Sequence, residues 1–337
     1  MQINSQYPGH LSKDTQATDL LAAVAEALEA AQRLFDGAPT MSARRRLYAA
    51  LSHLGAWIDQ FAASSPSPAE VQAVRTQVIE PLRTWSRGSR FFRNAYAKPR
   101  GYPGDFNTIE LIYRNQPAGD DLRGLILDDC YLHTVACQSV RNRLDFLVNR
   151  LRAETQRRRA SATAPVAILS LGSGPARELA LLSADPAFAQ SVAVTCVDLD
   201  SCALDYAARL LGETSLARVS YVHDNVLRYA AGSNRPAQRF DVIYAAGLFD
   251  YLDAARATGL LNDLHGLLKS DGTLIVGNFS LETPAGERSM LDWLFEWPLI
   301  YRNEASYQEI FAHTSFGTDN LLFEYEPLCA NMFAILT

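Results

Sequence analysis

Residues 168–180 read ILSLGSGPARELA, and this stretch decides the fold class. Its apolar start predicts a buried strand that ends at Leu171, and a glycine–serine–glycine turn at 172–174 follows directly. A helix is expected to begin at Pro175 or Ala176. Glycines let the backbone turn sharply and approach a ligand closely, while the amino end of a helix offers free N–H groups. The stretch therefore predicts a strand, loop and helix that bind a carboxylate or a phosphate.

The same alternation continues to the end of the chain. Apolar runs predict four more strands at 193–200, 219–226, 240–248 and 272–280, and helical stretches are expected at 176–182, 203–211 and 254–268. Short apolar strands that alternate with helices favour a parallel sheet covered on both faces. Residues 321–337 predict two further strands around Glu326 and Pro327, which would form an antiparallel edge. We therefore expect an α/β fold over residues 164–337, a Rossmann-like doubly wound sheet with an antiparallel terminal strand.

The first part of the chain has a helical apolar period instead. Residues 1–155 predict an all-helical N-terminal domain, which we regard as a candidate lid. One apolar stripe covers residues 20–35, and a long helix is expected over 122–152 with a break near Gly124. The segment QRRRASATAP at 156–165 is the expected domain boundary, with its arginines on a solvated helix end.

Composition limits the class of partner. The 337 residues include 31 Lys and Arg against 37 Asp and Glu, which argues against a nucleic-acid partner because phosphate-backbone binding relies on a basic face. No apolar run approaches the ~18 residues of a membrane span, and the first residues lack the pattern of a secretory signal. The five cysteines contain no CxxC pair, so we expect reduced thiols, no metal site and a cytoplasmic protein.

Polar residues follow the second and third predicted strands. Asp198 lies 26 residues after Gly172, and a carboxylate at the end of a second strand can reach the ribose hydroxyls of a nucleoside cofactor. The third strand ends at Asp224 and Asn225, where a carboxylate can accept from an adenine amino group and its neighbour can read a ring nitrogen. Nicotinamide-binding and S-adenosylmethionine-binding folds share this arrangement. The terminal strand pair, in place of a second mononucleotide half, favours the latter.

At this point residues 164–337 resemble a class I S-adenosylmethionine-dependent methyltransferase. The resemblance rests on LGSGPAREL, VDLD, HDNV, FDVIYAAGLFDYL and LLKSDGTLIVGNF. It implies S-adenosyl-L-methionine as cofactor, with contacts at Gly172, Ser173, Gly174, Asp198, Leu199, Asp224, Asn225 and Ala246. Two positions depart from the family pattern: Ser170 stands where an acidic residue is often seen, and Ala176 replaces the third glycine. We expect Ala176 to be tolerated, because that position needs a small side chain more than special torsions.

A narrower resemblance concerns the acceptor. The strings NAYAKPRGYPGDF, YLHTVACQSVRNR and EWPLIYRNEASY resemble bacterial methyltransferases that form 3-hydroxy fatty acid methyl esters. This implies a small-molecule acceptor with a carboxylate or a hydroxyl group. Tyr102 is a candidate contact of the cofactor's methionine end and Asp105 of its ammonium, although a rigid turn explains the loop equally well.

Several residues are candidates for the acceptor side. His133 is a candidate general base, with a core-edge histidine as the alternative. Tyr301 and Arg302 belong to an aromatic insert at 281–306, a candidate substrate cap, and Arg302 would suit an acidic acceptor through a bidentate pair. In the alternative interpretation, the insert is a helix that covers the sheet edge, which would account for its aromatic residues Trp293 and Phe295. Arg141 or Arg143 is a weaker candidate for a carboxylate partner, because a solvated helix face accounts for both.

These observations predict methyl transfer by in-line displacement to a small molecule. Two alternatives stay open. An aminopropyl transferase would use paired acidic residues, for which Asp250 and Asp253 are the nearby candidates. A non-catalytic interaction protein would bind the nucleoside as a ligand, and its helical domain would dock a partner. Separately, the helical domain is a candidate surface for a homodimer.

Overall fold

The computed structural model describes residues 41–160, 164–232 and 236–337. They form two compact units. Of the described residues, the helical unit comprises those up to Pro99, Asn115–Thr134 and Pro284–Pro298, and the sheet unit comprises those in Arg100–Arg114, Val135–Thr283 and Leu299–Thr337. The helix expected over residues 20–35 lies outside the described residues.

The helical unit is built around aromatic side chains. Its helices are α2 (Met41–Ala63), α3 (Pro68–Trp85), α4 (Arg90–Ala97), α6 (Leu122–Leu132) and α13 (Ala285–Phe295). Phe295 of α13 packs on Phe91 and Tyr131, with ring centroids 5.6 and 4.7 Å apart, and Trp293 packs on Phe61 at 5.9 Å. Trp293 and Phe295 of the aromatic insert therefore pack in the core of the helical unit and not on a sheet edge.

The long helix expected over 122–152 is two helices. Gly124 does not break it, because it lies in the first turn of α6, where its N–H donates to the Asp121 carboxylate at 2.7 Å. The break lies at residues 133–134, where the Thr134 hydroxyl donates to the carbonyl of Tyr131 at 2.8 Å. The next helix, α7 (Val135–Arg159), belongs to the sheet unit.

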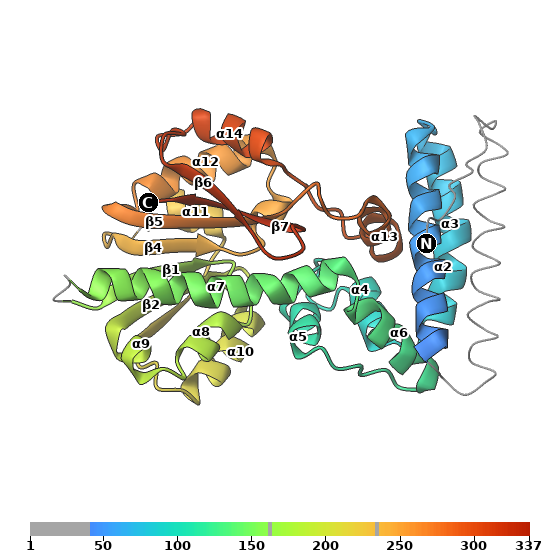
Figure 1. Cartoon of the computed structure of the whole chain (residues 1–337), viewed down its shortest axis with the longest axis horizontal. Coiled ribbons are helices and arrows are strands. Elements are labelled where there is room, and N and C mark those ends of the chain that lie inside the picture. The colour runs from blue at the N-terminus through green and yellow to red at the C-terminus, as the bar shows by residue number, and fades with distance from the viewer. Residues whose placement is uncertain (1–40, 161–163, 233–235) are drawn as a thin grey trace. The chain divides into compact units, whose positions relative to one another are not determined.

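The sheet unit has the predicted α/β architecture (Figure 1). Its strands are β1 (Val166–Leu171), β2 (Val192–Asp198), β3 (Val219–His223), β4 (Phe240–Ala245), β5 (Leu268–Phe279), β6 (Leu321–Tyr325) and β7 (Asn331–Leu336). They are ordered β3-β2-β1-β4-β5-β7-β6, with β1 to β5 parallel and β7 antiparallel to both neighbours. The Rossmann-like sheet with an antiparallel end is thereby confirmed.

Helices cover both faces of this sheet (Figure 1). One apolar core holds α11 (Val226–Ala231), α12 (Ala254–His265) and α14 (Glu304–Ala312), and the other holds α7, α8 (Arg177–Leu182), α9 (Pro186–Ser191) and α10 (Ser201–Gly212). The unit also contains α5 (Phe106–Arg114) and a 3-10 turn, η1 (Phe249–Tyr251). Across the described residues, no helix is long and apolar enough to cross a membrane.

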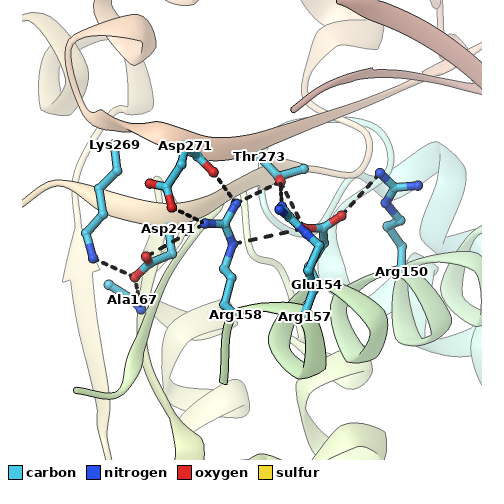
Figure 2. Close-up of polar contacts among 9 residues, drawn as sticks. All are labelled: Arg150, Glu154, Arg157, Arg158, Ala167, Asp241, Lys269, Asp271 and Thr273. Atoms are coloured by element: carbon cyan, nitrogen blue, oxygen red, sulfur yellow. Dashed lines mark hydrogen bonds and ion pairs between the residues drawn. The ribbon is translucent and has the colours of Figure 1, made fainter. Parts of the chain in front are cut away.

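A polar network fixes the end of α7 to the sheet (Figure 2). Glu154 accepts from Arg157 at 2.7 Å and from the Thr273 hydroxyl at 2.9 Å. Arg158 donates to the same hydroxyl at 3.0 Å and to the carbonyl of Asp271 at 2.6 Å. The arginine run is therefore not a wholly solvated helix end, because the Arg158 side chain is only 5% exposed.

Candidate cofactor and acceptor site

The glycine-rich loop lies where the strand order reverses. β1 pairs with β2 on one side and with β4 on the other, which is where sheets of this kind bind ligands. Gly172 and Gly174 have φ values of 59° and 51°, which glycine adopts without strain. Ala176 also has a φ of 51°, so this position requires a left-handed backbone in addition to the small side chain that we expected. An alanine in this conformation costs about 1 kcal/mol.

Asp198 is tied to this loop. It is buried, and its two carboxylate oxygens accept from the N–H groups of Gly174 at 2.8 Å and Asp200 at 2.9 Å. Burial raises the pKa of Asp198, while these N–H donors oppose the rise. Each oxygen keeps a further lone pair, which a ribose hydroxyl can use. The structure thus brings the loop and the carboxylate together at one edge of the sheet.

The remaining predicted adenosine contacts follow neighbouring strands. Leu199 is exposed directly after β2, and Ala246 is half-buried after β4. The N–H of Asp224 donates to the carbonyl of Asp198 at 3.0 Å, so the end of β3 lies beside the end of β2. A hydrogen bond from Arg228, 2.5 Å long, lowers the pKa of Asp224. Asn225 caps α11 through its side-chain oxygen, which leaves its amide nitrogen available for a ligand.

The loop before α5 belongs to the same unit and lies against this edge. Arg100 donates to both oxygens of Asp200, at 2.8 and 2.5 Å, and the Tyr251 hydroxyl donates to the carbonyl of Pro103 at 3.3 Å. Tyr102 is half-buried, and its pKa is raised by burial and by carboxylates that include Asp198. Tyr102, a predicted cofactor contact, therefore lies near Asp198, the predicted contact of the ribose.

Asp105 has an unsatisfied carboxylate oxygen. Its Oδ1 accepts from the N–H groups of Asn107 and Thr108, both at 3.0 Å, at the start of α5. Its Oδ2 is buried and receives no hydrogen bond from the described part of the chain. Burial raises the pKa of this carboxyl despite those donors. A buried oxygen in this state is expected to have a ligand donor, and an ammonium group fits that role.

A second polar cluster lies after β4. Asp250 in η1 accepts from the N–H of Phe279 at 2.7 Å, and its other oxygen is 4.0 Å from Nη1 of Arg143. Burial raises the pKa of Asp250 to about 7, although the charge of Arg143 opposes the rise. Arg143 is 5% exposed, so the interpretation of a solvated helix face is wrong for this residue. The sequence offered Arg143 and Asp250 as separate candidates, and it gave no sign that the two side chains lie together.

Arg302 holds the turn that carries Asp250. It is buried, and its guanidinium donates to the carbonyls of Phe249 and Leu252 and to the side-chain oxygen of Asn278. These contacts hold both ends of η1, the turn that carries Asp250. The described contacts of Arg302 are thus made to the fold and not to an open surface.

The two other predicted acceptor residues lie in different units. Tyr301 belongs to the sheet unit and packs on the ring of Phe279 at a centroid distance of 6.1 Å. His133 belongs to the helical unit, where its Nδ1 lies 2.7 Å from the carbonyl of Asp129. Its role as a base stays a prediction. Among the described residues, no cluster of three metal-ligating side chains occurs.

The sheet order, the loop after β1 and the carboxylate after β2 are those of a doubly wound, nucleotide-binding type of fold. Residues 168–272 match a family model described as a methyltransferase domain. The match covers the sheet unit from β1 to the start of β5, and the cofactor of this class of protein is S-adenosyl-L-methionine.

Comparison with solved structures gave a match to the overall fold with a TM-score above 0.5 and weaker matches to methyltransferases. A protein of Bordetella parapertussis, described as a possible exported protein, has 16% identity and a TM-score of 0.56, with 98% of this chain and 99% of that chain covered. The S-adenosylmethionine-dependent methyltransferase SibL has 16% identity and a TM-score of 0.48, with 89% of this chain and 77% of that chain covered. Magnesium protoporphyrin IX methyltransferase of Synechocystis PCC 6803, with bound SAM, has 9% identity and a TM-score of 0.41, covering 60% and 82%. A search of curated proteins gave no match.

Proposed function

We propose that the protein transfers a methyl group from S-adenosyl-L-methionine to a carboxylate or hydroxyl oxygen of a small molecule. The hydrogen bond between Gly174 and Asp198 carries this proposal. It joins the glycine-rich loop and the carboxylate of Asp198, which would bind the ribose, into one preorganised cofactor site. When bound, the cofactor supplies an electrophilic methyl group on a sulfonium. The residues of the chain then have to bind, orient and exclude water.

The chain offers a partner for each end of the cofactor. Asp198 is placed to accept from the ribose hydroxyls, and Asp105 Oδ2 is placed to accept from the ammonium. Leu199 presents an apolar surface for the adenine, with Asp224 and Asn225 as its polar contacts. Tyr102 would pack at the methionine end. Two ion pairs, Arg100 with Asp200 and Arg177 with Glu110, hold the Tyr102 loop and α5 on the core.

The residues after β4 favour an oxygen acceptor. Residues 245–249 read AAGLF, and none of these side chains can orient an amino group. A carboxylate is ionised at pH 7 and accepts a methyl group without a base; a hydroxyl acceptor would need one, for which His133 is our candidate. A 3-hydroxy fatty acid offers both groups. Aminopropyl transfer is less well supported, since Asp250 accepts from a backbone N–H and Asp253 caps α12.

We also propose a cytoplasmic location and a small-molecule acceptor in place of nucleic acid. All five cysteines are free, which fits a reducing compartment.

Calorimetry with S-adenosylhomocysteine tests the cofactor site. Asp198→Ala is expected to weaken binding at least ~30-fold, because it removes the acceptor of the ribose hydroxyls and leaves the Gly174 N–H unpaired. Asp205→Ala, on the exposed face of α10, is the control and should bind as the wild type does. Equal affinity of the Asp198 variant would refute the proposed site. Transfer of label from methyl-labelled cofactor then tests catalysis.

A further inference from the structure

Arg100 is bound to a buried carboxylate at the adenosine end of the site. Its Nε and Nη2 donate to the two carboxylate oxygens of Asp200, at 2.8 and 2.5 Å. The Asp200 side chain is 3% exposed, and it also caps α10 because its Oδ1 accepts from the N–H of Cys202 at 2.9 Å. A guanidinium that donates to both oxygens of a carboxylate holds it in one geometry. Arg100 and the start of α10 are therefore fixed to each other.

Residues 100–105, which we call the strap, have contacts on both sides of the glycine-rich loop. At one end of the strap, Arg100 binds Asp200, which follows the last residue of β2 by two positions. In its middle, the carbonyl of Pro103 accepts from the hydroxyl of Tyr251 in η1, after β4. Because β1 lies between β2 and β4, these two contacts lie on either side of the loop that follows β1. The strap therefore runs across the edge of the sheet where we place the cofactor.

The strap carries two of the predicted contacts of the cofactor's amino-acid end. Tyr102 is half-buried, and its pKa is raised by burial and by the charges of Asp198 and Asp200, so its phenol lies near both carboxylates. Asp105 is 1% exposed, and its Oδ2 receives no hydrogen bond from the described residues. A buried oxygen without a donor indicates a ligand. The hydrogen bonds of Arg100 thus fix the first residue of a segment that holds both predicted contacts.

Arg100 also balances the charge of Asp200 beside Asp198. The N–H of Asp200 donates to Asp198 at 2.9 Å, so the two residues are close neighbours. Burial raises the pKa of Asp198 and the charge of Asp200 adds to the rise, while the N–H groups of Asp200 and Gly174 oppose it. Burial also opposes the ionisation of Asp200, but the donors of Arg100 and of α10 outweigh it and lower the pKa of Asp200. Without the guanidinium, the charge of Asp200 would stand unpaired next to Asp198.

The other titratable groups nearby do not supply this balancing charge. They are Tyr102 of the strap, Cys196 of β2, Cys202 of α10, and His223 and Asp224 at the end of β3. Burial raises the pKa of Tyr102 and of Cys196, so both are uncharged at neutral pH. Asp224 is paired with Arg228. In the part of the chain that the structure describes, Arg100 is the one cation that donates a hydrogen bond to Asp198 or Asp200.

We propose that Arg100 is a positioning residue of the cofactor site, which fixes the strap, with Tyr102 and Asp105, to the turn that follows Asp198. This inference rests on the proposed function and deepens it. The ribose and the amino-acid end of the cofactor are then bound by one rigid assembly. A strap that is already in place does not have to be ordered when the ligand binds, which strengthens binding of the amino-acid end. Arg100 acts through Asp200 and the strap, and not by contact with the reacting atoms.

The first test compares ligands with and without the amino-acid end. Calorimetry on the full chain at pH 8 measures the affinities for S-adenosylhomocysteine and for 5′-methylthioadenosine, which lacks the amino acid. Arg100→Gln should bind S-adenosylhomocysteine about 10-fold more weakly than wild type, and its affinity for 5′-methylthioadenosine should stay within about threefold. Arg209→Gln, at an exposed position of α10, is the control and should match wild type with both ligands. Equal weakening for the two ligands, or none for either, overturns the role of Arg100.

The second test is the pH profile of S-adenosylhomocysteine binding. In wild type, binding should weaken as the pH falls through the pKa of Asp198, because protonation removes the carboxylate that accepts from the ribose. Arg100→Gln should move the midpoint of this loss upward by about one pH unit, since an unpaired Asp200 disfavours a second charge beside it. Arg100→Lys keeps the positive charge and should return the midpoint to within about 0.3 pH units of wild type. Because lysine lacks the planar fork, this variant should still bind about 5-fold more weakly at pH 8.

The outcomes separate the two proposals. Absence of S-adenosylhomocysteine binding to wild type at every pH overturns the proposed function. If wild type binds, an unchanged midpoint in Arg100→Gln overturns only the positioning role of Arg100, because a purely structural arginine would change the melting temperature and not the pH profile. Should Arg100→Gln not fold, Arg100→Lys decides the matter, since wild-type affinity of that variant at pH 8 would show that the two-pronged contact with Asp200 does not position the strap.

Discussion

Replacement of Asp250 by asparagine is expected to flatten the pH dependence of stability. Asp250 is 2% exposed, and burial raises its pKa from 3.8 to about 7 even though Arg143 lies 4.0 Å away. The folded protein therefore binds a proton that the unfolded chain releases between these two values. This stability is fully present below pH 3.8 and is lost as the pH rises through about 7.

The magnitude follows from the size of the shift. A difference of about three pKa units corresponds to about 4 kcal/mol in total, of which about 2–3 kcal/mol is lost between pH 5 and pH 8. Asparagine keeps an oxygen for the N–H of Phe279 and carries no titrating proton. The free energy of unfolding of Asp250→Asn, relative to wild type, should therefore rise by that amount over this interval.

Urea denaturation at pH 5 and pH 8 measures this difference. Asp253→Asn is the control, because Asp253 caps α12 with a side chain that is 56% exposed, and asparagine is an equally good cap. The control should follow wild type at both pH values. A constant difference between Asp250→Asn and wild type would show that Asp250 is ionised across the whole range and that the environment described for η1 is wrong.

Three further substitutions test separate features. Arg158→Ala should lower the free energy of unfolding by about 3–5 kcal/mol in urea denaturation, because it breaks a buried network. The control Arg159→Ala, at an exposed position, should change it by less than about 1 kcal/mol. Similar losses in the two variants would contradict the network. Gly174→Ala should lower the free energy of unfolding by about 1 kcal/mol, because Gly174 has a positive φ. Calorimetry should show that this variant binds S-adenosylhomocysteine more than ~10-fold more weakly. Unchanged binding would place the ligand elsewhere. Asp105→Asn should weaken the same binding about 30-fold. Its melting temperature should not fall, since Oδ2 of Asp105 has no donor among the described residues. A destabilised variant with normal affinity would make Asp105 structural.

The sheet could be read from the sequence because its signal is local. Each of the five parallel strands overlaps one of the predicted apolar runs, although β3 is largely exposed and β5 begins at Leu268 and not at Gly272. The ends of β1 and β2 follow from the same signal, so the proximity of Gly174 and Asp198 was predictable. Ala176 was not, because an alanine gives no sign that its φ is positive.

Arg143 shows why the surroundings of a helix residue could not be predicted in the same way. On α7 alone, Arg141 and Arg143 look alike, and arginines on helices are usually solvated. What distinguishes them is contact with Gly247 and with Asn331, which lies 188 residues further along the chain. The periodicity of one helix contains no information about those contacts.

The role of Arg302 could not be predicted for the same reason. Arg302 follows an aromatic segment and looks suited to an acid, but its donors are used by two carbonyls of the turn around η1 and by Asn278. Only hydrogen-bond geometry shows that this buried guanidinium positions the turn that carries Asp250.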